Sequence, residues 1–65
     1  MNVALLEYEM KKKGVSAQIL CDKIGISRSA FYRKCKGMSD FSLTEIKQIL
    51  AVLELGSPMD IFFAN

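Results

Sequence analysis

The chain has 65 residues, 51% of them hydrophobic, which suits one compact helical domain over residues 1–65 and leaves little chain for an active-site cleft of the usual size. It contains no His, and Cys21 and Cys35 have no companions at metal-ligand spacing, so the sequence predicts no metal site, no cofactor and no enzyme. The net charge is only +2, but residues 1–40 hold eight of the nine Lys and Arg residues against four acids, so positive charge is concentrated there.

The first two predicted helices are marked by residues that cap helix ends. Asn2 is a good cap for a helix that runs to about Lys13, where Gly14 ends it. Ser16 then caps a second helix that runs to Ile24. The first helix carries an apolar stripe of Val3, Leu6 and Met10, with Leu5 beside it.

A third helix follows almost at once. Gly25 suits the left-handed conformation that a tight turn needs, Ser27 is the next cap, and the helix ends near Lys36, before another Gly. Apolar pairs spaced as hydrophobic staples fix the entry to the second, third and fourth helices: Val15 with Leu20, Ile26 with Phe31, and Phe41 with Ile46.

The last two helices are predicted from a capping box and a proline. Ser42 and Glu45 form the capping box of a fourth helix that we expect to end at about Leu55. Its expected core stripe is Leu43, Ile46, Ile49, Leu50 and Leu53. Ser57 caps a brief terminal helix with Pro58 at its first position. That helix carries Met59, Ile61, Phe62 and Phe63.

Residues 16–37 have the pattern of a helix-turn-helix, in which the second helix of the motif lies in the major groove of DNA. The two helices can bury Leu20, Ile24, Ile26, Phe31 and Cys35 between them, and the small Cys21 stands where they approach closely. The outward residues of the second motif helix are hydrogen-bond donors and one aromatic, with no acid: Arg28, Ser29, Tyr32, Arg33 and Lys36.

The whole chain resembles the Cro and phage-repressor helix-turn-helix family. The likeness rests on the small Cys21 in the second helix, the turn Gly25 with Ile26 after it, and the Ser-Arg-Ser start at residues 27–29. The Phe-Tyr-Arg-Lys run at residues 31–34 and the ending Met-Asp-Ile-Phe-Phe at residues 59–63 are also similar to small phage and prophage regulators. The resemblance implies a five-helix, all-α fold.

Together, motif and resemblance predict a sequence-specific regulator of transcription that binds double-stranded DNA, of phage or prophage repressor type. Arg28 and Arg33 are expected at base edges or phosphates, because an arginine fork can bond guanine O6 and N7 together. The full set of expected DNA contacts is Ser16, Gln18, Ser27, Arg28, Ser29, Tyr32, Arg33 and Lys36. The alternatives are that the two arginines are ordinary solvated residues and that Tyr32 is partly buried against the second helix.

Two positions depart from the family pattern. Members often have Gln at the first position of the second helix, where it braces a phosphate and the reading helix; here Ala17 occupies it, with Gln18 next. A late core position of the third helix, usually aliphatic, holds Lys34, with Cys35 beside it. Either the helix is slightly rotated or, as we expect, the Lys34 stem packs while its ammonium reaches solvent.

The C-terminal region carries more apolar surface than a core of this size readily covers, so we expect a two-fold dimer. Its interface would hold Val52, Leu55, Met59, Phe62 and Phe63. Alternatively, Phe62 or Phe63 folds back under the first helix, or the terminal helix docks another regulator, which would make the chain a protein-interaction module.

The remaining expectations concern the compartment. Without a signal-peptide pattern or an apolar run of membrane-spanning length, the sequence favours the cytoplasm of a bacterial cell or a phage-infected host. Cys21 and Cys35 fit reduced core thiols in that compartment, with a redox switch as the alternative.

Overall fold

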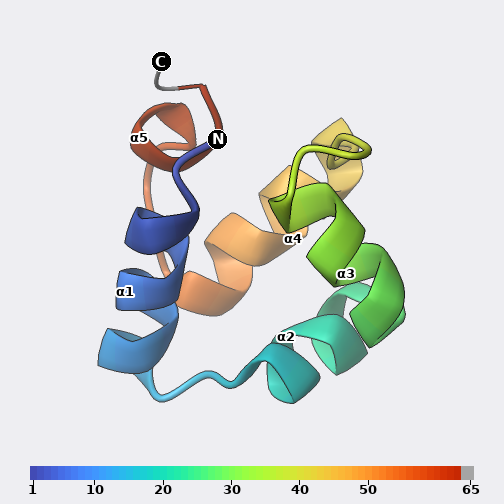
Figure 1. Ribbon diagram of the computed structural model, residues 1–65. Coiled ribbons are helices and arrows are strands. Elements are labelled where there is room, and N and C mark those ends of the chain that lie inside the picture. Colours follow the sequence, from blue (N-terminus) through green and yellow to red (C-terminus); the bar gives the residue numbers. More distant parts are fainter. Residues whose placement is uncertain (64–65) are drawn as a thin grey trace.

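The computed structural model describes residues 1–63, apart from the side chain of Met59. Within these residues the chain forms five helices and no strand: α1 (Val3–Lys13), α2 (Ala17–Ile24), α3 (Arg28–Cys35), α4 (Leu43–Leu53) and α5 (Met59–Phe62). α1 and α5 lie together, α2 and α3 form the opposite side, and α4 runs between α1 and α3 (Figure 1). This is the predicted all-α fold. None of the described helices is both long and apolar enough to cross a membrane.

The side chains predicted to cap the first four helices all do so. Each cap oxygen accepts a hydrogen bond from the backbone N–H three residues on: Asn2 from Leu5 at 3.0 Å, and Ser16, Ser27 and Ser42 from Ile19, Ala30 and Glu45 at 3.1 Å. The capping box is complete, because the Glu45 side chain accepts from the Ser42 N–H at 2.8 Å. These bonds satisfy donors that have no partner within the helix.

The core draws on every helix. Its buried residues are Leu6, Met10, Leu20, Cys21, Ile24, Phe31, Ile49, Leu53 and Ile61. Leu43 does not join it: its side chain is 64% exposed, so its predicted place in the α4 stripe is wrong. The first turn of α4 lies at the end of the helix away from α1 and α5 (Figure 1), and it buries Ile46 but leaves Leu43 exposed. Helical periodicity marks a side of the helix, not how far along it the neighbours reach.

α4 ends two residues earlier than predicted. Glu54 adopts the left-handed conformation at φ 57°, and the Leu55 N–H donates to the carbonyl of Leu50 at 2.9 Å. This turn directs the half-buried Leu55 back onto the core. Burial of an apolar side chain thus offsets the roughly 1–2 kcal/mol that a left-handed conformation costs a residue with a Cβ.

The terminal helix closes the domain under the start of the chain. The Asn2 N–H donates to the carbonyl of the buried Ile61 at 2.6 Å, and α5 lies beside the N-terminus (Figure 1). The half-buried Phe62 meets the ring of Phe41 edge to face, with centroids 5.7 Å apart. Phe62 therefore packs on the core of the monomer beside Phe41, whereas Phe63 is 52% exposed.

Candidate nucleic-acid interface

α2 and α3 are joined by the tight turn that the sequence predicts. Gly25 has a φ of 75°, and its N–H donates to the carbonyl of Cys21 at 2.8 Å. The next residue, the half-buried Ile26, donates to the same carbonyl at 3.1 Å and packs on the core, and Ser27 then caps α3. Cys21 is buried at this close approach. The local geometry is that of a helix-turn-helix with α3 as the reading helix.

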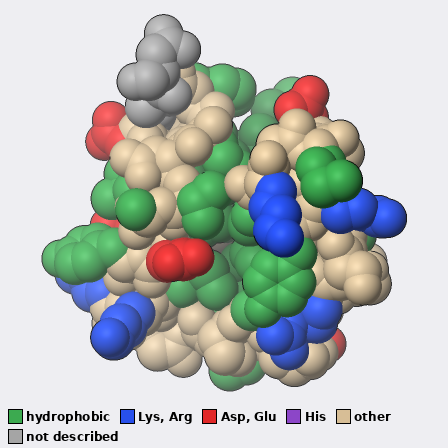
Figure 2. All heavy atoms as spheres, viewed as in Figure 1, with side chains coloured by type: hydrophobic (Ala, Val, Ile, Leu, Met, Phe, Trp, Pro, Cys, Tyr) green, Lys and Arg blue, Asp and Glu red, His purple; other side chains and the backbone are tan. Residues whose placement is uncertain are grey.

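The residues predicted to contact DNA are all exposed. We call them the reading surface: Ser16, Gln18, Ser27, Arg28, Ser29, Tyr32, Arg33 and Lys36. The members in α3 and its C-cap Lys36 stand at spacings of one, four, five and eight residues from Arg28, which places them on one side of the helix. Lys and Arg side chains gather over the right of Figure 2, where Figure 1 shows α3. The helix therefore presents a basic face to solvent.

Arg28 is the centre of a chain of hydrogen bonds across this surface. Its Nη2 donates to the Tyr32 hydroxyl at 2.9 Å, and its guanidinium lies 5.5 Å from the centre of the Tyr32 ring. Its Nη1 makes a longer contact of 3.4 Å to Gln18 Oε1, and Gln18 Nε2 donates to Asp22 at 2.9 Å. The bond to the tyrosine hydroxyl raises the pKa of Arg28 above its ordinary value, so the guanidinium stays charged.

The structure bears on two points that the sequence left open. Tyr32 is 47% exposed and aligned with Arg28, so it is available on the reading surface. The half-buried Ala17 packs against the core, and Gln18, one residue later, contacts the first residue of α3. The brace between the two motif helices is thus present, shifted by one position from the family pattern.

Arg33, Ser29 and Lys36 complete the basic face. All three are exposed, and among the described residues no hydrogen bond or ion pair engages the Arg33 guanidinium. An arginine has five donors in a planar fork, which suits paired acceptors such as guanine edges and phosphates. Arg33 can therefore turn toward a ligand without breaking contacts within the protein.

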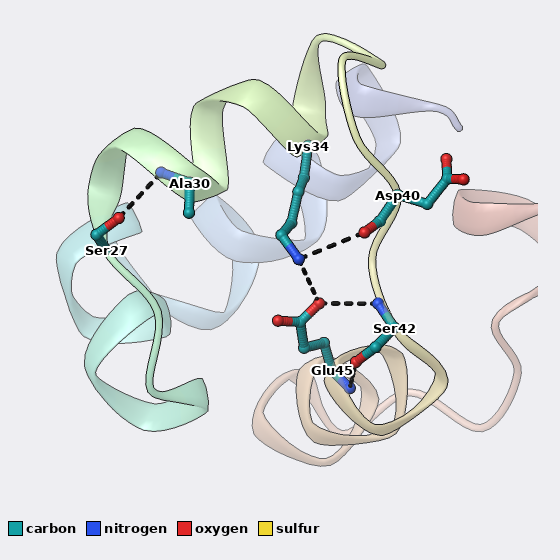
Figure 3. Close-up of polar contacts among 6 residues, drawn as sticks. All are labelled: Ser27, Ala30, Lys34, Asp40, Ser42 and Glu45. Atoms are coloured by element: carbon teal, nitrogen blue, oxygen red, sulfur yellow. Dashed lines mark hydrogen bonds and ion pairs between the residues drawn. The ribbon is translucent and has the colours of Figure 1, made fainter.

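Lys34 does not behave as expected. Its ammonium does not reach open solvent: Nζ donates to Glu45 Oε1 at 2.8 Å and to the carbonyl of Asp40 at 3.3 Å (Figure 3). The two paired side chains are only 17% and 15% exposed. The expectation is wrong because it considered α3 alone. The partner, Glu45, belongs to α4 and lies eleven residues further along the chain, so local spacing does not predict the pair.

The two cysteines are free thiols on the inner side of the motif. Cys21 is buried and Cys35 is half-buried, and burial raises the pKa of both thiols above the ordinary value. Both are therefore protonated at neutral pH and poor nucleophiles. Among the described residues, no group of three His, Cys, Asp or Glu side chains is placed to hold a metal ion.

A tight turn, a capped reading helix and a basic outward face define a DNA-binding helix-turn-helix domain. Residues 6–63 match the family model of the Cro/C1-type HTH DNA-binding domain, and the chain belongs to that family. No curated protein and no solved structure shows a significant match to it.

Proposed function

We propose that the protein is a sequence-specific transcriptional regulator of the phage or prophage repressor type, which places α3 in the major groove of double-stranded DNA. The observation that carries this proposal is the pre-positioned Arg28, held between Gln18 and Tyr32 on the exposed side of α3. Because the fork is oriented before DNA arrives, less side-chain freedom is lost on binding.

The remaining residues divide between base edges and backbone. Arg28 and Arg33 read bases, aided by Ser29 and Tyr32, and Lys36 contacts a phosphate. The first turns of α2 and α3 carry no acid, so the positive ends of both helix dipoles can face phosphates. The caps Ser16 and Ser27 use a lone pair within the helix, which leaves their hydroxyl protons for phosphate oxygens.

The proposal includes a two-fold dimer formed through the C-terminal region, acting in the cytoplasm of a bacterial cell or a phage-infected host. Support comes from the exposed Phe63 and from the half-burial of Val52, Leu55 and Phe62, which leaves part of each side chain for a second copy. The side chain of Met59, the fifth predicted interface residue, lies outside the described residues. Such a dimer presents two copies of α3 to half-sites about 34–36 Å apart.

A second candidate function is that of a module that docks another regulator. A cavity of about 430 Å³ beside the terminal helix favours it, with Phe41, Ile46, Phe62 and Phe63 in its walls. The two functions separate when Arg28 and Arg33 are both changed to Glu. Loss of DNA binding with the regulated gene released would support the first, and retained regulation through a partner would support the second.

The deciding experiment is selection of bound sequences from random duplex DNA. We expect enrichment of a two-fold symmetric site containing guanines, with an affinity that falls steeply as salt rises. A variant carrying both Arg28→Ala and Arg33→Ala is the control and should enrich nothing. If the wild type also enriches no sequence, the regulator proposal fails.

A further inference from the structure

The two ends of the reading helix are held by different means. At its start, the Ser27 cap accepts from Ala30, and α3 packs chiefly against α2. Near its end, the Lys34 side chain reaches across to α4 and the loop before it (Figure 3). The ammonium joins Glu45, a residue of α4, to the Asp40 carbonyl, while the Asp40 carboxylate points away from it (Figure 3).

This contact is sheltered, unlike the other ion pair between described residues. Lys34 and Glu45 are 17% and 15% exposed and 2.8 Å apart, whereas Lys13 and Glu54 are 3.8 Å apart and Glu54 is 79% exposed. The Lys34 ammonium also lies 5.7 Å from the centre of the Phe41 ring. Its hydrogen bond, with that of the Ser42 N–H, lowers the pKa of Glu45, so the carboxylate is charged at neutral pH.

Glu45 therefore does two things at once. Its Oε1 accepts both the Ser42 N–H, which closes the capping box, and the Lys34 ammonium, each at 2.8 Å. A glutamine can close a capping box as well as a glutamate. The negative charge itself serves two other interactions, the ion pair with Lys34 of α3 and the favourable contact with the positive end of the α4 dipole.

We propose, on the basis of the proposed function, that Lys34 and Glu45 are positioning residues for DNA recognition: their ion pair ties the end of α3 to the start of α4 and sets the direction of Arg33 and Lys36. Lys34 is then the one cation of α3 that does not face DNA. Arg33 precedes it directly, and Lys36 follows two residues later, so a tilt of this end of the helix displaces both side chains together.

A positioning role of the Lys34–Glu45 ion pair and a direct electrostatic role of Glu45 predict opposite effects of Glu45→Gln on DNA binding. If the carboxylate acted on DNA only through its charge, its removal would strengthen binding by lessening repulsion. If it holds α3, its removal weakens binding. In a chain that also carries Lys34→Met, the ion pair is already lost, so Glu45→Gln should weaken DNA binding no further.

The experiment compares binding of the selected duplex by Lys34→Met, Glu45→Gln, the double variant, Lys34→Arg and the matched control Lys36→Met, at a temperature where circular dichroism shows each to be folded. Lys34→Met should weaken binding roughly two- to thirtyfold. Lys36→Met removes a phosphate contact of the proposed function and should lower the salt slope by about 0.9. Lys34→Arg should bind more tightly than Lys34→Met, because an arginine guanidinium can also pair with a carboxylate.

Stronger binding by Glu45→Gln, or losses that simply add in the double variant, would show that Lys34 acts on DNA directly and would overturn the proposal, as would unchanged affinity in both single variants. Amide hydrogen exchange of the free protein tests, independently of DNA, whether the ion pair holds the end of α3. Exchange at residues 33–36 should be faster in Lys34→Met than in Lys36→Met. Equal exchange rates would overturn the proposal. Failure of the wild type to bind any selected duplex would instead refute the proposed function.

Discussion

Replacement of Phe31 by Ala tests how the two motif helices are held together. Phe31 is buried on the inner side of α3, and its ring lies edge to face with that of Phe41, with centroids 6.0 Å apart. The smaller side chain leaves a cavity where α3 meets the core, because the surrounding helices can collapse only partly. The variant therefore loses both the free energy gained by transferring the ring out of water and the contacts that the ring makes in the core.

The expected loss is large relative to the stability of the domain. A buried Phe→Ala change costs about 3–5 kcal/mol. The upper part of that range applies, because a ring pair worth about 0.5–1.5 kcal/mol is lost as well. At about 0.05–0.15 kcal/mol per residue, a domain of 65 residues has a free energy of unfolding of roughly 3–10 kcal/mol. Phe31→Ala should therefore lose a large part of its free energy of unfolding, and all of it if the domain lies at the low end of that range.

Urea unfolding followed by circular dichroism measures this. Leu43→Ala is the control: it also truncates a large apolar side chain, but one that is 64% exposed, so its free energy of unfolding should stay within about 0.5 kcal/mol of the wild type. Phe31→Leu keeps most of the volume and should lie between the two. A folded Phe31→Ala variant with the wild-type midpoint would refute the packing described for α3.

Three further predictions concern binding, pH and assembly. Arg28→Ala or Arg33→Ala should weaken binding of the selected duplex by about 1–3 kcal/mol where that side chain reads a base, with an unchanged melting temperature; a variant that unfolds would make its residue structural. The hydrogen bond from Lys34 depresses the pKa of Glu45 in the folded protein, so the stability it contributes is present above the unfolded pKa near 4.3 and is lost as pH falls through the folded value. Urea titrations should therefore show a shallower acid loss of unfolding free energy for Glu45→Gln, and parallel curves would contradict this. In sedimentation at tens of micromolar the wild type should be a dimer and Phe63→Lys a folded monomer, and a wild type that stays monomeric on and off DNA would reject the dimer.

The starts of the first four helices were predictable because their determinants are local. The side chains of Asn2, Ser16, Ser27 and Ser42 each bond a backbone N–H three residues away. Such a bond depends on residue type and spacing alone, whatever the rest of the chain does. The Gly25 turn is equally local, since few other residues adopt its backbone conformation without strain.

The exposure of the reading surface was also predictable. Arg28, Tyr32 and Arg33 follow the helical period, and the burial of Phe31 and the half-burial of Cys35 mark the inner side of α3. The contacts within that surface were not predictable. The bonds from Arg28 to Gln18 and Tyr32 depend on how α2 and α3 cross and on the side-chain rotamers.

The sequence by itself thus determined the helices, the turn between α2 and α3, and which side of α3 faces outward, because capping, glycine conformation and periodicity act within a few residues. Only the tertiary structure decided that Leu43 is exposed, that Gln18 reaches α3 and that Lys34 pairs with Glu45. Each of these three features depends on how one helix is placed relative to its neighbours. That placement comes from the packing of the whole core, so no spacing along the chain encodes it.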